Sequence, residues 1–150
     1  MAIPAQFNGI DHVVLRVTNL ERTLGFYVDV LGLTVERIFE KINLYQVRCG
    51  RNLIDIQPLG PTESLAKPAD RGIEHLCLSI QGNIDEVVEA LQKADVKIDM
   101  GPMEVYGATG FGTSVYVSDP DGYSIELKAH YAKKPVVFPL ATPAPARSEP

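Results

Sequence analysis

The sequence has few cysteines, no excess of basic residues and no long apolar run. Cys49 and Cys77 are too few for a disulfide framework and lack metal-ligand spacing, which favours two reduced residues used for packing. Fourteen Lys and Arg residues against 19 Asp and Glu residues give a net charge of −5, which does not favour nucleic acid or an anionic membrane. The longest apolar stretches are shorter than the roughly 18 to 20 residues of a membrane span, and residues 1–8 lack the pattern of a secretory signal. We therefore expect a cytoplasmic protein without nucleic-acid or membrane partners.

The length of 150 residues, with 45% of them apolar, fits one ordinary domain. We expect this domain over residues 1–134, followed by a tail over residues 135–150. The tail contains five prolines, a composition that resists regular structure; the alternative is that its apolar residues dock on a partner subunit. Residues 58–71 are rich in proline and glycine and are expected to form an exposed linker within the domain.

The linker separates two copies of one sequence motif. Residues 9–12, Gly-Ile-Asp-His, return at residues 72–75 as Gly-Ile-Glu-His, which is an offset of 63 residues. Each copy is followed by an apolar-rich run that predicts a strand, and then by apolar residues at steps of three and four that predict a helix. Asn19 and Asn83 are suited to cap these helices. The copies define modules over about residues 9–57 and 72–129.

Three further strands are predicted after the helix of each module. The expected strands cover residues 13–17, 34–40, 43–49 and 52–57, then 76–80, 97–104, 113–118 and 123–129, with helices over 20–31 and 84–91. This order predicts an α+β fold of two βαβββ modules in a pseudo-twofold arrangement. We expect the eight strands to form an open, barrel-like sheet around a cleft, with the helices outside. The glycine-rich residues 107–112 are expected either as a flexible loop over this cleft or as a plain connection between strands.

Side-chain alternation along the predicted strands sorts the polar residues by face. His12 and Arg16 share one face of the first strand, opposite a purely apolar set, and His75 has the same place as His12 in the second module. Asp55 and Glu126 occupy corresponding places on the last strand of each module, each between two apolar residues. Each module therefore presents an imidazole and a carboxylate on the face that its helix does not cover.

If the two polar faces curve toward each other, two imidazoles and two carboxylates meet in one cleft. This donor set suits one divalent ion, Ni, Co, Zn, Mn or Fe, with positions left for water or substrate. Alone, each His or Glu would be expected to be an ordinary hydrogen-bonded residue, but the recurrence in both modules favours ligation by His12, His75 and Glu126. Asp55 has a shorter side chain and could ligate directly, bind through water or only orient a ligand. His130 has no counterpart in the repeat and receives no role.

These residues resemble a known family. His12, residues 26–33 (Phe-Tyr-Val-Asp-Val-Leu-Gly-Leu), His75 and residues 119–127 (Asp-Pro-Asp-Gly-Tyr-Ser-Ile-Glu-Leu) are similar to motifs of the vicinal oxygen chelate superfamily, and the resemblance covers about residues 10–128. The superfamily includes glyoxalase I, methylmalonyl-CoA epimerase, fosfomycin-resistance thiol transferases, extradiol dioxygenases and metal-free bleomycin-binding proteins. The resemblance thus implies the fold and the ligand pattern, but not one activity. It also implies a small-molecule substrate and a homodimer, in some members with each site shared between subunits.

Glyoxalase I is the nearest member by motif. The resemblance implies that Arg16 binds substrate, at the position where that enzyme contacts glutathione; the alternative for Arg16 is a surface ion pair. It implies that Glu126 is the catalytic base, with Asp55 as a helper, while a metal ion stabilises an enediolate. Glutathione is then an expected co-substrate. The chain departs from the glyoxalase I pattern at Asp55, where that enzyme has Glu, and at Leu59, where it has a polar glutathione contact.

The sequence thus predicts a metal-dependent lyase or isomerase of the glyoxalase I type that acts on a small vicinal-oxygen substrate. A thiol transferase or an extradiol-type dioxygenase on the same metal site is the enzymatic alternative; the first requires a thiol co-substrate, and the second requires ferrous iron and O₂. A metal-free protein that sequesters its ligand is the non-enzymatic alternative. The presence of both histidines and Glu126 argues against it, because metal-free binders of the superfamily generally lack that set.

Overall fold

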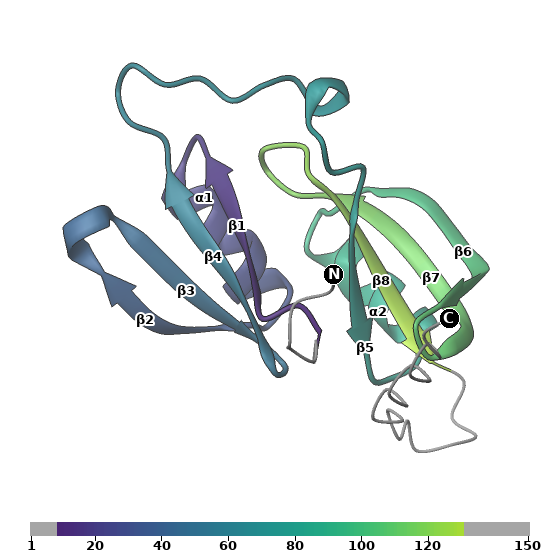
Figure 1. Cartoon of the computed structure of the whole chain (residues 1–150). Coiled ribbons are helices and arrows are strands. Elements are labelled where there is room, and N and C mark those ends of the chain that lie inside the picture. Colours follow the sequence, from purple (N-terminus) through teal and green to yellow (C-terminus); the bar gives the residue numbers. More distant parts are fainter. Residues whose placement is uncertain (1–8, 131–150) are drawn as a thin grey trace, which may run out of the picture.

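A computed structural model describes residues 9–130 of the chain (Figure 1). The predicted tail over residues 135–150 lies outside the described residues. The elements are, in chain order, β1 (His12–Val17), α1 (Leu20–Leu24), the π-helix η1 (Gly25–Val30), β2 (Thr34–Phe39), the 3-10 helix η2 (Glu40–Ile42), β3 (Leu44–Cys49), β4 (Asn52–Pro58), the 3-10 helix η3 (Pro68–Asp70), β5 (Leu76–Ile80), α2 (Ile84–Lys93), β6 (Ile98–Gly107), β7 (Gly110–Ser118) and β8 (Ser124–His130). The predicted order of helices and strands is confirmed in both halves.

The strands form two four-stranded sheets with the same topology. Sheet 1 has the order β1-β4-β3-β2 and sheet 2 the order β5-β8-β7-β6. In each sheet the first strand of the module pairs in parallel with the last, and the other pairs are antiparallel. The duplicated α+β fold is therefore as predicted. The expected single barrel-like sheet is corrected in one respect: within the described chain the eight strands are hydrogen-bonded as two separate open sheets.

The helices begin at the predicted capping residues. The Asn19 side chain accepts a hydrogen bond from the backbone N–H of Arg22 at 2.9 Å, and that of Asn83 accepts one from the N–H of Asp85 at 2.8 Å. The first helix differs from the uniform one expected over residues 20–31, because one α-helical turn continues into η1. None of the helices in residues 9–130 is long and apolar enough to cross a bilayer.

The glycine-rich segment is a tight hairpin and not a loop over a cleft. β6 extends to Gly107 and β7 begins at Gly110, so that two residues make the turn. Gly110 has φ of +100°, a conformation that favours glycine and allows the strands to continue to the tip. Tyr106 and Phe111 face each other near this tip, with ring centroids 5.1 Å apart, and both are more than half exposed.

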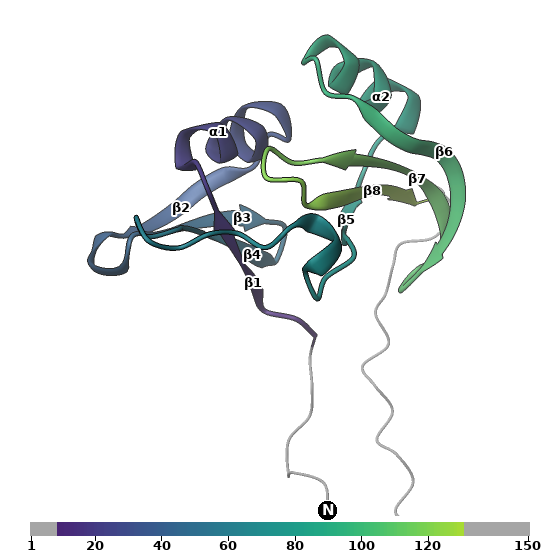
Figure 2. The same ribbon diagram turned by 90° about the horizontal axis from the view of Figure 1, so that it is seen from above.

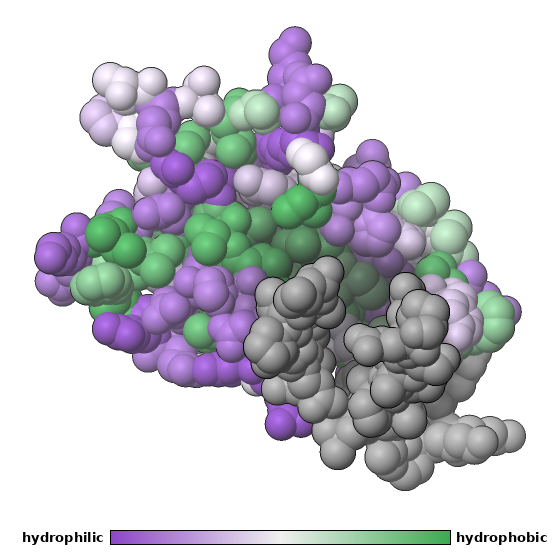
Figure 3. All heavy atoms as spheres, in the orientation of Figure 1, coloured by the Kyte–Doolittle hydropathy of each residue, from purple (hydrophilic) through white to green (hydrophobic). Residues whose placement is uncertain are grey.

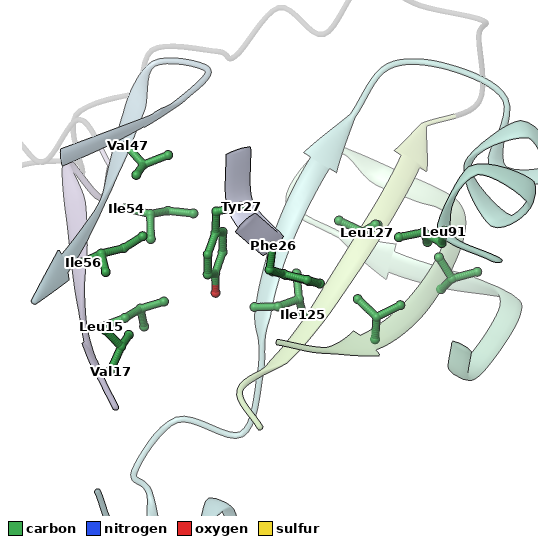
Figure 4. Packing of buried hydrophobic residues seen from close by; sticks show 12 residues of the cluster. Leu15, Val17, Phe26, Tyr27, Val47, Ile54, Ile56, Leu91, Ile125 and Leu127 are labelled. Carbon is green, nitrogen blue, oxygen red and sulfur yellow. The ribbon is translucent and has the colours of Figure 1, made fainter. Parts of the chain in front are cut away.

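One apolar core joins the two halves. It includes Leu15 and Ile54 of sheet 1 and Ile125 of sheet 2. Phe26 and Tyr27 of η1 lie between the apolar face of sheet 1 and Ile125 (Figure 4). The hydroxyl of the fully buried Tyr27 donates a hydrogen bond to Asp119, at the β7–β8 turn, at 3.0 Å. The first helical segment therefore packs on its own sheet and also holds the second module.

Both helices lie on the same side of the two sheets, which leaves the opposite sheet faces uncovered by helices (Figure 2). Figure 3 looks onto these faces and shows an apolar band across the middle, with polar atoms above and below it. Val14 of β1, on the same strand face as His12, is an exposed apolar residue, with 47% of its surface accessible. The faces that carry the predicted ligands are thus on the side away from the helices, as the alternation of residues predicts.

Candidate metal centre

Glu126 lies in the middle of the polar face of sheet 2. The register places it between Cys77 of β5 and Tyr116 of β7. Residues paired across neighbouring strands present their side chains on one face, so Cys77, Glu126 and Tyr116 form a row across the sheet. The carboxylate is almost fully buried, with a side-chain exposure of 4%. A buried carboxylate needs hydrogen-bond donors or a cation to remain charged.

The donors around Glu126 are supplied by the same sheet. The hydroxyl of the buried Ser114 donates to Oε1 of Glu126 at 2.6 Å, and Nε2 of His75 lies 3.1 Å from Oε2. Cys77 and Tyr116 also donate to this carboxylate. The Tyr116 ring meets the His75 ring edge to face, with centroids 5.5 Å apart. Histidine and glutamate are therefore brought together as the sequence predicts.

These contacts determine the charge of Glu126. Burial alone would raise the pKa of its carboxyl group, but the hydrogen bonds from Ser114, Cys77 and Tyr116 and the charge of His75 outweigh burial and lower it. The carboxylate is therefore ionised at neutral pH. An ionised, positioned carboxylate can bind a divalent cation or accept a proton.

Cys77 stays a neutral thiol beside this carboxylate. Burial, followed by the negative charge of Glu126, raises the pKa of Cys77 to about 11. The thiol of Cys77 is therefore a hydrogen-bond donor to Glu126. Cys49, on sheet 1, also has its pKa raised by burial.

The polar face of sheet 1 has the corresponding pair. The register places Asp55 of β4 beside Val14 of β1 and Gln46 of β3. The Gln46 amide donates to both oxygens of the buried Asp55 carboxylate, each at 3.2 Å. His12 begins β1 on the same face, and the charge of Asp55 contributes to a raised pKa of His12 after the larger effect of a hydrogen bond to Asp11. Val14 stands where sheet 2 has Cys77, so Asp55 lacks the thiol donor that Glu126 has.

The acidic residue before each histidine has a role that the sequence analysis missed. Nδ1–H of His12 donates to Asp11 at 2.7 Å, and Nδ1–H of His75 donates to Glu74. A carboxylate on one ring nitrogen orients the imidazole and leaves the other nitrogen for a metal or a proton. The signal was present in the sequence, because the repeated motif has an acid directly before the histidine in both copies.

The four predicted ligands fall into two pairs in a single chain. His75, directly before β5, and Glu126 of β8 lie at sheet 2, and His12 and Asp55 belong to sheet 1. No group of three or more His, Cys, Asp or Glu side chains within residues 9–130 is arranged to hold a metal ion. The donor chemistry of each pair fits a divalent cation, but two protein ligands are fewer than the three of a typical catalytic zinc site. Ligation by these four residues therefore remains a prediction.

Arg16 lies on the polar face of sheet 1, as predicted, and forms an ion pair. Its Nη2 donates to Oε2 of Glu63, in the linker, at 2.5 Å. The same oxygen of Glu63 accepts a hydrogen bond from the backbone N–H of Gly60 at 2.6 Å. The Arg16 carbonyl accepts a hydrogen bond from the hydroxyl of Tyr123 at 3.1 Å.

Lys128 is a second charged residue on the polar face of sheet 2, and the sequence pattern indicates no role for it. It follows Glu126 by two residues, is 2% exposed, and donates its ammonium group to the carbonyl of Val105 on β6. Gly107 and Gly112 leave room for it, since an added Cβ would lie 3.0 Å from its Cε and 3.3 Å from its Nζ respectively. Lys128 thus connects β8 to β6 across β7.

His130 ends β8 and is held by two hydroxyl groups. Its Nε2 lies 2.7 Å from Oγ of Ser79, and its Nδ1 lies 2.8 Å from Oγ1 of Thr109. These contacts join the end of β8 to β5 and to the turn of the β6–β7 hairpin. A shallow groove on another part of the molecule contains none of the predicted ligands; its lining residues are Leu20, Glu21, Leu24, Gly25, Val28, Asp29, Val35 and Tyr45.

Known proteins resemble this chain in sequence over most of its length. The model of the Glyoxalase/Bleomycin resistance protein/Dioxygenase superfamily matches residues 9–127. Virulence protein STM3117 of Salmonella typhimurium is 34% identical over 131 residues, which cover 81% of this chain and 83% of that protein. Lactoylglutathione lyase of the same organism is 32% identical over 126 residues, 77% of this chain and 88% of the enzyme.

A crystal structure of the same virulence protein, STM3117, matches this fold. The superposition has a TM-score of 0.67 at 30% sequence identity, and it covers 85% of this chain and 100% of that one. The match includes both modules, since it extends over most of the described residues.

Proposed function

Because the chain belongs to the glyoxalase/bleomycin resistance protein/dioxygenase superfamily, we propose that it is a metal-dependent lyase or isomerase acting on a small vicinal-oxygen substrate. Its relatives include lactoylglutathione lyases at about 30% identity. One observation carries the proposal: Glu126 is a buried carboxylate, kept ionised by three donors and placed 3.1 Å from His75. Burying such a charge costs free energy that a purely structural residue could avoid.

In this proposal His12, Asp55, His75 and Glu126 hold one divalent ion. The ion supplies positive charge where negative charge develops on substrate oxygens. Glu126 moves the proton at the adjacent carbon, since its carboxylate is ionised and fixed by Ser114. Asp55, held by Gln46, is the weaker candidate for this proton transfer.

We propose further that the site is completed in a homodimer. Each sheet carries two of the four ligands, and a single chain does not bring three of them together within residues 9–130. In a symmetric dimer, sheet 1 of one protomer faces sheet 2 of its partner, and the symmetry produces two identical sites. The exposed Val14 on the polar face of sheet 1 then lies in the contact.

The experiment that tests the proposed function starts with the metal content of the purified full chain, before and after loading with Ni, Co, Zn, Mn or Fe. Turnover of methylglyoxal is then followed with glutathione and with its diethyl ester as the thiol, with and without a chelator. We expect bound metal and chelator-sensitive turnover. A chain that takes up none of the five metals would contradict the proposal and favour a metal-free binding protein.

Two results would indicate a different reaction at the same metal site. Consumption of O₂ by the ferrous form would indicate a dioxygenase, and addition of the thiol to a second substrate would indicate a thiol transferase. Glu126→Gln is the test variant, and Glu86→Gln, in the exposed part of α2, is the matched control. Loss of turnover in the first variant alone is the result that the proposal requires.

A further inference from the structure

The guanidinium group of Arg16 is already occupied by a carboxylate of the same chain. Its Nη2 lies 2.5 Å from Oε2 of Glu63, and both side chains are less than half exposed, at 38% and 46%. Within residues 9–130, Glu63 is the one acidic side chain paired with Arg16. Glu63 bonds to Nη2 of this guanidinium group, while the buried Nε has no hydrogen-bond partner within the described residues, so the carboxylate balances the charge of Arg16 without completing a two-bond pairing.

A local turn of the linker aims Glu63 at Arg16. The backbone N–H of Glu63 donates to the carbonyl of Gly60 at 3.0 Å, and the N–H of Gly60 donates back to Oε2 of Glu63 at 2.6 Å. An added Cβ at Gly60 would lie 3.1 Å from that oxygen, so glycine leaves room for the close approach. The hydrogen bond from Gly60, followed by that from Arg16, lowers the pKa of Glu63, which keeps its carboxyl group charged at neutral pH.

The surroundings of the Arg16–Glu63 pair also differ from those of a site that binds anions. Leu59, next to Gly60, is apolar and partly buried, and its backbone N–H is bonded to the carbonyl of Val17 at 2.9 Å. A ligand carboxylate that approaches Arg16 has to displace Glu63 or lie beside its negative charge. Like charges placed together at an interface repel each other and weaken binding. A hydroxyl or amide group has no such cost and can bond to either member of the pair.

We propose that Glu63 is a specificity-determining residue that closes Arg16 to carboxylate-bearing substrates and selects substrates that are uncharged at this end. The inference rests on the proposed function, since it concerns the substrate class of the same site. Arg16 lies four residues from His12 along β1, about 13 Å by the rise of a strand, so it contacts the end of a substrate distant from the reacting atoms. Glutathione conjugates, which carry two carboxylates, are therefore poor substrates for this chain.

The test compares a charged ligand with its neutral counterpart. Binding of S-hexylglutathione and of its diethyl ester is measured by calorimetry on the full chain, for the wild type, Glu63→Gln, Arg16→Met and the double variant. We expect Glu63→Gln to bind S-hexylglutathione about tenfold more tightly than the wild type, with no change for the ester. The gain should disappear in the double variant, because it requires the freed guanidinium group.

Two results would overturn the inference: equal affinity of the wild type and Glu63→Gln for S-hexylglutathione, or a gain that persists without Arg16. Glu63→Ala is a second variant that removes the polar group together with the charge, and its thermal midpoint serves as the folding check. Binding is measured in metal-free and in metal-loaded protein. Failure of the proposed function would appear as absent metal uptake, and the ligand comparison in metal-free protein would still decide the role of Glu63.

Discussion

Nε2 of His75, the residue directly before β5, lies 3.1 Å from Oε2 of Glu126 on the adjacent strand β8, which is far away in sequence. The parallel pairing of β5 with β8 creates this proximity, because it places Cys77 opposite Glu126 and leaves His75, directly before β5, beside it. The other nitrogen of His75 donates to Glu74. The imidazole is thus fixed from both sides, and this rigidity underlies the first two predictions.

Replacing Glu126 with Gln should remove the ligand charge and the proton acceptor together. We expect turnover of the metal-loaded protein to fall by about 10²- to 10⁴-fold, the range of a lost general base. Metal content measured by mass spectrometry should fall as well. Glu86→Gln, on the exposed side of α2, should retain both metal and turnover. Full activity of the Glu126 variant would exclude this residue as the base.

Replacing Ser114 with Ala should weaken metal binding through Glu126. The Ser114 hydroxyl donates to Glu126 at 2.6 Å and favours its ionised form, so its loss raises the pKa of that carboxyl group. A carboxylate with a raised pKa is protonated earlier as the pH falls, so the acidic limb of metal binding should move to higher pH. Loss of a partner of a metal ligand typically reduces metal affinity by about 10- to 100-fold.

The measurement is the metal affinity from pH 5 to 8. Ser118→Ala is the matched control, because Ser118 is an exposed serine of the same strand that donates to Asp99 at 2.8 Å. An identical pH profile for the wild type and both variants would mean that Ser114 does not influence Glu126.

A mixing experiment tests the shared site. His12→Gln removes a proposed metal ligand from the sheet 1 side of a chain, and His75→Gln removes one from the sheet 2 side. If each site joins sheet 1 of one protomer to sheet 2 of its partner, heterodimers of the two variants contain one intact site and one doubly defective site. In a refolded equal mixture, random pairing makes about half of the dimers heterodimers, and each heterodimer has one intact site of its two. The mixture should then recover about a quarter of the wild-type activity.

Each variant alone supplies the control and should be inactive at the same total concentration. A mixture that stays inactive, although native mass spectrometry detects the heterodimer, would place all four ligands in one chain.

The sequence allowed the fold to be predicted because its signals were local and repeated. The offset of 63 residues, the caps at Asn19 and Asn83 and the strand alternation each specify short-range structure, and the duplication made each signal count twice. The glycine-rich residues 107–112 form the plain connection between strands, which was one of the two expected forms. The separation of the eight strands into two sheets is of longer range, because it depends on packing between the modules and no local pattern indicates it.

The residues of the candidate site could be predicted from the sequence, but their arrangement in space could not. Alternation placed His75 and Glu126 on one face, and parallel pairing then brings them into contact. The ion pair between Arg16 and Glu63 joins a strand to a linker 47 residues away, so no spacing in the sequence could indicate it. Lys128 is buried and donates to the carbonyl of Val105 on β6, two strands away from β8, and this tertiary contact has no local signal in the sequence.

The contact between the two modules gives the last prediction. The hydroxyl of Tyr27 is buried and donates to Asp119 at 3.0 Å; burial, followed by the negative charge of Asp119, raises the pKa of Tyr27 far above its usual value, so it stays a donor at all accessible pH values. Tyr27→Phe keeps the ring and removes the donor. Asp119 keeps its bonds from the backbone N–H groups of Asp121 and Tyr123, each at 2.9 Å, so the carboxylate loses one partner of three.

For Tyr27→Phe we expect the free energy of unfolding in urea to fall by about 1–2 kcal/mol. Tyr106→Phe, where the side chain is largely exposed, should change it by less than about 0.5 kcal/mol. Equal effects of the two variants would mean that the Tyr27 hydroxyl does not stabilise the contact between the modules.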